Sequence, residues 1–153
     1  MIAPLATVRA GDRFPIPGFP LHVTLLPPID SISELALADV VARFAVTAEP
    51  FTVEGLTCAW FGKRSDIRVT VVDTEPALSM HLDLLQKVES RGARVVEPAY
   101  SEAGFVPHVT SNNRTSFDVG ATLRAESIAV VSMADLPTVL SVHKLGSARE
   151  EQN

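Results

Sequence analysis

Two copies of one triplet, His-Val-Thr, occur at His22–Thr24 and His108–Thr110. Each copy lies in a run rich in apolar and β-branched residues, LHVTLL and FVPHVTS, and such runs predict β-strands. Because side chains alternate between the two faces of a strand, the imidazole and the hydroxyl of each triplet share one face, and the valine between them packs inward. Two such strands facing each other would surround a small anion with two imidazoles and two hydroxyls.

These groups match the needs of phosphodiester cleavage. One group must take a proton from the attacking water or hydroxyl, and another must protonate the departing oxygen. Histidine suits both tasks because its ordinary pKa lies near neutrality, and threonine hydroxyls can donate to the non-bridging oxygens of the phosphate. The sequence does not decide which histidine is the acid and which is the base, because both have the same local context.

The scheme needs no metal ion, and the sequence offers little to hold one. It contains no HExxH, no HxH and no paired cysteines. We therefore expect neither a metal nor a cofactor.

Composition restricts the partner. The formal net charge is −5 and the sequence pI is about 5.3, which argues against a protein that grips a long nucleic acid by its phosphates. The net charge is compatible with binding of a small nucleotide or the terminus of an RNA, because such a ligand needs only a few cationic groups. The sequence contains no run of eighteen consecutive apolar residues, which is the length that a membrane-spanning helix needs. We expect a monomer.

The single cysteine, Cys58, cannot form an internal disulfide, so a reducing compartment such as the cytoplasm is expected. Its apolar surroundings, TVEGLTCAWF, predict a buried thiol with no basic neighbour.

Several elements must position the triplets. Ser31 and Glu34 have the spacing of a capping box before one amphipathic helix. A second helix is predicted to start at Thr74, with Pro76 in its first turn, and to stop at Gly92. Besides the strands that carry the triplets, strands are predicted at FTVEGLTCAW, DIRVTVVD, SIAVVSM and TVLSVHKL. The mixture predicts an α+β fold, a single bilobal domain over residues 1–146 and a disordered tail over 147–153.

The second triplet is followed by two further polar residues of interest. If the strand persists, Asn112 and Arg114 lie on the face of His108. Arg114 is then a candidate phosphate ligand, although a solvated loop arginine is the simpler interpretation.

Other residues also have two interpretations each. One of the two aromatic residues Trp60 and Phe61 is expected to pack in the core, and the following Lys63–Arg64 to form a solvated turn. Stacking of Trp60 or Phe61 on a base is the alternative. His81 is expected to be a partly buried structural residue of the second helix, and His143 to face solvent or a sheet edge.

The residues resemble the two-histidine (2H) phosphoesterase superfamily, which includes 2′,5′ RNA ligase-like proteins and cyclic phosphodiesterases. The resemblance rests on LHVTLLPP early and PAYSEAGFVPHVT late in the chain, with helices between, and covers roughly residues 20–146. It implies two antiparallel sheets with pseudo-twofold symmetry around a central cleft, and two main helices on the outside. It also implies activity on 2′,3′-cyclic phosphates or 2′,5′ linkages, with His22 and His108 catalytic and Thr24 and Thr110 binding the phosphate.

Two alternatives to this interpretation remain. A nucleotide-binding module would keep the same cleft with little or no turnover. A structural or interaction domain with coincidental triplets would hold the two histidines far apart. If the enzyme interpretation is correct, ring nitrogens of His22 and His108 are expected about 5–8 Å apart, on either side of one phosphate.

Overall fold

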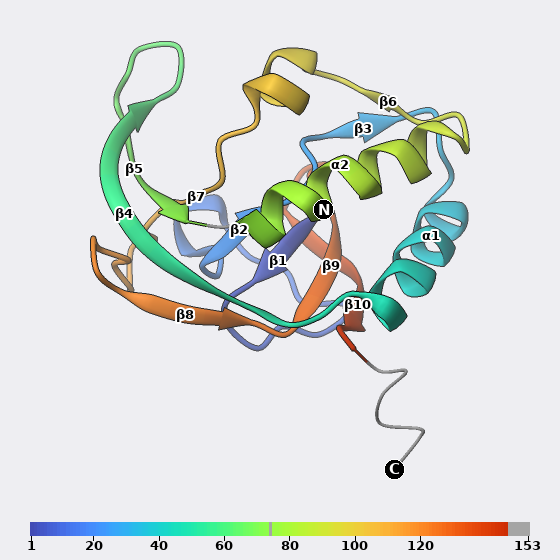
Figure 1. Ribbon diagram of the computed structural model, residues 1–153, viewed down its shortest axis with the longest axis horizontal. Helices are drawn as coiled ribbons and strands as arrows, with labels where there is room; N and C mark the ends of the chain where they lie inside the picture. Colours follow the sequence, from blue (N-terminus) through green and yellow to red (C-terminus); the bar gives the residue numbers. More distant parts are fainter. Residues whose placement is uncertain (74, 147–153) are drawn as a thin grey trace.

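Two four-stranded antiparallel sheets and two helices form the α+β fold of the computed structural model, which describes residues 1–73 and 75–146 (Figure 1). The first sheet has the order β10-β9-β1-β2, with β1 at Ile2–Pro4, β2 at His22–Thr24, β9 at Ser127–Ser132 and β10 at Thr138–Lys144. The second has the order β7-β5-β4-β8, with β4 at Phe51–Phe61, β5 at Ile67–Asp73, β7 at His108–Val109 and β8 at Thr122–Ala125. Shorter elements are β3 (Ile29–Asp30), which pairs with β6 (Arg94–Val95), and three 3₁₀ turns, η1 (Ile16–Gly18), η2 (Pro98–Tyr100) and η3 (Glu102–Gly104).

The two sheets are built alike. In each of them a His-Val-Thr triplet begins the strand at one end of the order, β2 in the first sheet and β7 in the second. These two strands lie next to each other although they belong to different sheets. The architecture therefore has the bilobal, pseudo-symmetric form that the sequence predicted.

Helix α1 (Glu34–Thr47) begins after Ser33, whose hydroxyl oxygen accepts a hydrogen bond from the backbone N–H of Ala36 at 3.1 Å. The prediction that Ser31 caps this helix was wrong, because the cap lies further along the chain. Ser31 has a left-handed backbone (φ 62°) and donates its hydroxyl to Asp30, so it belongs to the preceding turn.

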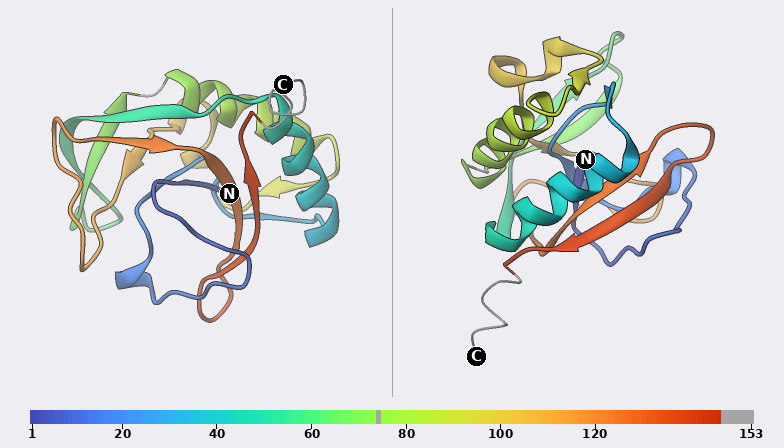
Figure 2. Two further views of the ribbon diagram at one scale, coloured as in Figure 1. Left: turned by 90° about the horizontal axis from the view of Figure 1, so that it is seen from below. Right: turned by 90° about the vertical axis from the view of Figure 1, so that its right-hand side faces the viewer.

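Helix α2 (Glu75–Glu89) ends three residues before the predicted stop at Gly92, and Gly92 has the left-handed conformation (φ 91°) in the turn that follows the helix. Thr74, the predicted start, lies outside the described residues. Viewed from the side, α1 lies between α2 and the β9–β10 hairpin, and it contacts all three elements (Figure 2). Neither helix is long and apolar enough to span a membrane, as far as the described residues go.

The largest buried cluster joins both sheets and both helices. Val23 of β2, Val53 of β4, Val41 of α1 and Leu84 of α2 belong to it, and each has an exposed fraction of 0%. The triplet strands are therefore fixed to the same core as the helices. The segment 147–153, predicted to be disordered, lies outside the described residues.

The strand predicted at FVPHVTS is limited to His108–Val109. Pro107 has no N–H for the ladder on one side, and on the other the side chain of Asn112 accepts hydrogen bonds from the N–H groups of Arg114 and Thr115 and turns the chain. The expectation that Asn112 and Arg114 continue the strand face of His108 is therefore wrong.

The predicted burial of Cys58 on β4 is also wrong. Cys58 is exposed and accepts a hydrogen bond from Nε of Arg68 at 3.0 Å, and the exposed fraction of Trp60 is 60%. The reason is the length of the β4–β5 hairpin, whose far end extends away from the helices and leaves one face of the strands uncovered (Figure 1). Pairing of β4 with β5 brings Arg68 beside Trp60 and gives Cys58 the basic neighbour that the sequence did not reveal.

Candidate active site

His22 is held by its own strand and by the chain just before it. It lies on β2, which pairs with β1 in the register His22↔Pro4. Its Nδ1–H donates to the carbonyl oxygen of Pro20 at 2.8 Å. The ring of Phe19 packs edge-on against the imidazole, with ring centroids 5.0 Å apart and planes at 80°. The hydrogen bond and the aromatic contact together fix the plane of the imidazole.

His108 has the same two kinds of contact. It lies on β7, which pairs with β5 in the register Val71↔His108. Its Nδ1–H donates to the carbonyl oxygen of Val106 at 2.8 Å, again two residues before the histidine. The ring of Phe61, from the end of β4, packs edge-on at 4.7 Å with planes at 74°.

The hydrogen bonds fix the protonation pattern of both rings. A carbonyl oxygen only accepts, so Nδ1 of each histidine carries a proton and Nε2 is the nitrogen that changes its protonation state. A neutral ring then presents an acceptor at Nε2, and a protonated ring presents a donor there. Two rings of this kind have the groups that an acid–base pair requires.

The two histidines influence each other electrostatically. Burial lowers the pKa of His22 below its ordinary value, and the carbonyl of Pro20 opposes this effect. The positive charge of His108 lowers the pKa of His22 further. The N-terminal amine of Met1 does so only when it is protonated, and burial lowers its own pKa to about 5. The influence of His108 agrees with the adjacent positions of β2 and β7. The separation of the ring nitrogens stays a prediction.

The threonines follow their histidines as expected, with different exposure. Thr24 is half-buried within β2, and Thr110 is exposed just beyond the end of β7. Val23 and Val109, the central residues of the triplets, both have an exposed fraction of 0%. The prediction that each valine packs inward is confirmed.

Asn112 connects the second triplet to the segment before the first. Its side-chain amide donates to the carbonyl of Phe19 at 3.0 Å, and the N–H of Asn113 donates to the carbonyl of Pro17 at 2.8 Å. Arg114 is exposed in the same turn. Its role as a phosphate ligand stays a prediction.

Comparison with known proteins identifies the family. The sequence matches the model of the 2′-5′ RNA ligase superfamily over residues 3–153. The chain belongs to this superfamily. The structure is also similar to the crystal structure of TT0787 of Thermus thermophilus, with a TM-score of 0.58 and 21% sequence identity, over 82% of this chain and 78% of that one. No curated protein matches the sequence.

Membership confirms the resemblance seen in the sequence and indicates phosphoesterase or ligase-type activity. The similarity to TT0787 supports the 2H fold, with its two helices and antiparallel sheets.

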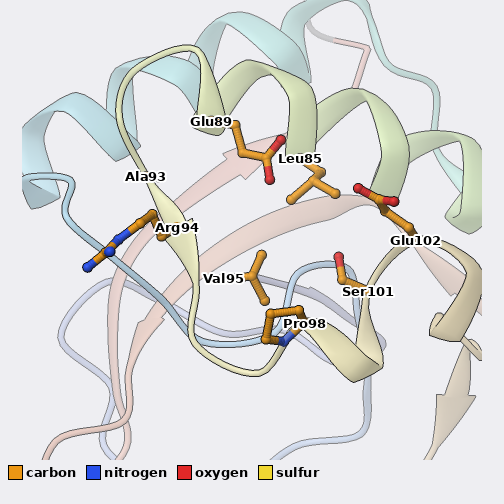
Figure 3. A pocket seen from close by; sticks show the side chains of 8 residues that line it. All are labelled: Leu85, Glu89, Ala93, Arg94, Val95, Pro98, Ser101 and Glu102. Atoms are coloured by element: carbon orange, nitrogen blue, oxygen red, sulfur yellow. The ribbon is translucent and has the colours of Figure 1, made fainter.

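One pocket of this 2H protein is separate from the triplets. It has a volume of about 420 Å³ and lies between α2 and the segment from β6 to η3 (Figure 3). None of the triplet residues lines it, and its charged lining residues are Glu89, Glu102 and Arg94, so that carboxylates outnumber the one guanidinium. Two carboxylates would repel a phosphate, so this pocket is no candidate for the phosphate site. Among the described residues, no group of three or more His, Cys, Asp or Glu side chains is arranged to hold a metal ion.

The immediate surroundings of the two histidines were only partly predictable. The sequence suggests Phe61 as a group that could stack on a base, and the structure places Phe61 against His108 and Phe19 against His22. The carbonyls of Pro20 and Val106 escaped sequence reasoning. The sequence carries no specific signal for them, because every residue supplies a backbone carbonyl.

Proposed function

We propose that this protein is a metal-independent phosphoesterase acting on a 2′,3′-cyclic phosphate or a 2′,5′-linked nucleotide or RNA end. In this proposal His22 and His108 are the acid–base pair, and Thr24 and Thr110 donate hydrogen bonds to the phosphate. The observation that carries it is the matched environment of the two histidines. Each uses Nδ1–H on the carbonyl two residues earlier, and each packs edge-on against a phenylalanine.

The proposed reaction on a cyclic phosphate needs two proton transfers. A neutral Nε2 takes a proton from water as the water oxygen bonds to phosphorus. The protonated Nε2 of the other histidine gives its proton to the ribose oxygen as the bond between that oxygen and phosphorus breaks. The products are a phosphomonoester and a free hydroxyl. The base then releases its extra proton to solvent and the acid takes up one proton from solvent, which returns both rings to their starting states.

The surroundings of His22 support its assignment as the base. Burial and nearby positive charge, including that of His108, lower the pKa of His22, so its ring is neutral at neutral pH, as a general base must be. His108 is then the acid. The rate should therefore rise with pH as His22 loses its proton, at a pH below the ordinary histidine pKa.

Turnover of 2′,3′-cyclic mononucleotides and of 2′,5′-linked dinucleotides, each followed by chromatography, tests the proposal. We expect product with the wild-type protein and a loss of product with His22→Ala or His108→Ala. His143→Ala is the matched control, because His143 lies on β10 in neither triplet and contacts Ser141 of its own strand. Saturable binding without product would instead support the nucleotide-binding module.

A chelator tests the independence from metal. We expect turnover to persist in excess EDTA, because two imidazoles and two hydroxyls supply every proton and hydrogen bond in the scheme. Loss of turnover that a specific divalent ion restores would contradict this part of the proposal.

A further inference from the structure

His81 has contacts that go beyond packing. It lies on α2, outside both triplets, with an exposed fraction of 0%. Its Nδ1–H donates to the carbonyl of Leu25 at 2.7 Å, and its Nε2 accepts a hydrogen bond from the backbone N–H of Glu102 at 2.9 Å. The hydroxyl of Ser101 is also 3.3 Å from Nε2. Because a backbone N–H only donates and a carbonyl only accepts, these contacts require one neutral form of the ring, with the proton on Nδ1.

The partners of His81 belong to the two chain segments that carry the triplets. Leu25 directly follows Thr24 at the end of β2. Glu102 lies in η3, on the approach to β7. A single imidazole therefore joins the end of the first triplet's strand to the segment that leads into the second.

A stacked ring brings the connection close to His108. The ring of Phe105 lies parallel to that of His81, with centroids 4.0 Å apart and planes at 1°. Phe105 precedes Val106, whose carbonyl accepts the Nδ1–H of His108. The second triplet is therefore connected to His81 by a hydrogen bond and by a ring stack.

The backbone at Glu102 shows that this turn needs support. Glu102 has a left-handed conformation (φ 50°), which is unfavourable for a residue other than glycine and persists only where its surroundings hold it. Its N–H is the group that donates to His81. The hydrogen bond from Glu102 thus helps to hold the conformation of the approach to β7.

We infer that His81 is a positioning residue that sets the separation and orientation of the two His-Val-Thr strands. The inference rests on the proposed function, in which both strands act on one phosphate. An apolar residue would fill the same space without fixing either segment, whereas His81 specifies where each backbone lies relative to α2. It acts through the two triplets and not on the phosphate itself.

Two substitutions each remove one of the two hydrogen bonds of His81 and keep the other. In His81→Asn the side-chain amide N–H lies near the position of Nδ1 and keeps the bond to Leu25, but the acceptor for Glu102 is lost. In His81→Gln the longer side chain places an oxygen near the position of Nε2 and keeps the bond from Glu102, but the donor to Leu25 is lost. Leu84→Val is the matched control, because it removes packing from a buried residue of α2 without removing a hydrogen bond.

The test combines kinetics with NMR of the histidine rings. We expect each His81 variant to lower kcat by about tenfold or more with a smaller change in KM, because a misplaced acid or base slows the chemical step. His81→Gln should shift the imidazole signals of His22 more than those of His108, and His81→Asn should do the reverse. Leu84→Val should lower the melting temperature and leave kcat and both sets of signals unchanged.

Unchanged imidazole signals and kcat in both folded His81 variants would overturn the inference and leave the proposed function intact. If no phosphoester is turned over, the proposed function fails, and the NMR comparison still decides the role of His81 because it needs only folded protein. If neither His81 variant folds, Phe105→Leu removes the stacked ring and keeps both hydrogen bonds. Shifted His108 signals in that variant support the inference, and unshifted ones overturn it.

Discussion

The two triplets reach the same local geometry from different surroundings. His22 lies on a strand of three residues paired with β1, and its aromatic neighbour Phe19 comes from the loop just before it and packs against Phe14. His108 lies on a strand of two residues at the end of its sheet, and its aromatic neighbour Phe61 comes from the far end of β4. The first site is built locally, and the second depends on a distant hairpin.

The comparison separates the features that the two sites share from those that differ between them. Both sites keep the carbonyl two residues before the histidine and the edge-on phenylalanine. The source of the phenylalanine, the length of the strand and the exposure of the threonine all vary. Matched imidazole geometry in unequal surroundings is the arrangement expected of two rings with opposite proton-transfer roles.

The largest expected effect tests whether the two histidines act as a pair. We expect His22→Ala and His108→Ala each to lower kcat by about 10²- to 10⁴-fold, because either change removes one proton transfer. The double variant should be little worse than either single one, since the remaining histidine cannot act alone. Steady-state kinetics on the best substrate of the screen measures this. Full activity in His108→Ala would contradict the assignment.

The threonines should give the next largest effect. Thr24→Val and Thr110→Val each remove one hydroxyl at similar side-chain volume, and we expect about 10- to 100-fold losses in kcat. Thr24→Ser and Thr110→Ser keep the hydroxyl and are the controls. Equal activity of the Val and Ser variants would show that the hydroxyls do not bind the phosphate.

Substitutions of Phe19 and Phe61 test the comparison between the two histidine sites most directly. We expect Phe19→Leu and Phe61→Leu each to lower kcat about 2- to 10-fold, because an edge-on aromatic contact contributes about 0.5–1.5 kcal/mol to holding the imidazole plane. Trp60→Leu is the control for Phe61, since it alters the neighbouring residue of β4, which faces the opposite side of the strand. A loss in Trp60→Leu as large as that in Phe61→Leu would mean that the hairpin acts as a whole.

The smallest expected effect is on stability. Burial lowers the pKa of His22 and of His143 in the folded protein, so the unfolded chain binds their protons first as the pH falls. The contribution to the free energy of unfolding is therefore complete above about pH 6.5 and decreases below it. Urea unfolding at a series of pH values should show this decrease, and His22→Asn should make it less steep. An unchanged slope in His22→Asn would contradict the burial effect.

Much of the fold follows from local patterns in the sequence. The triplet strands, the two helices and the turn at Gly92 were predictable because alternation, helical spacing and a glycine signal lie within a few residues. Strands β1, β3, β6 and β8 were missed because they are short, at two to four residues, and exist through pairing with distant strands.

The sequence predicted the triplet residues of the candidate site but not the contacts that hold them in place. The types and spacing within each triplet revealed the histidines and threonines. The contacts of His81 were not visible, because its partner Leu25 lies 56 residues away in sequence and contributes only a backbone carbonyl. Asn112 reaches Phe19 over 93 residues in the same way. Any residue type can supply a backbone carbonyl, so the identity of the partner residue does not reveal such a contact.

The position of β1 has a consequence for the order in which the protein is completed during synthesis. This strand pairs with β2 on one side, through Ile2↔Thr24, and with β9 on the other, through Ile2↔Ala129. The ribosome makes β1 before both of these neighbours, and Ala129 lies 129 − 2 = 127 residues after Ile2 in the sequence. A nascent chain that ends after β8 already contains both triplets, but the sheet behind His22 lacks β9 and β10. The sheet of the first triplet is therefore complete only when the β9–β10 hairpin has joined β1.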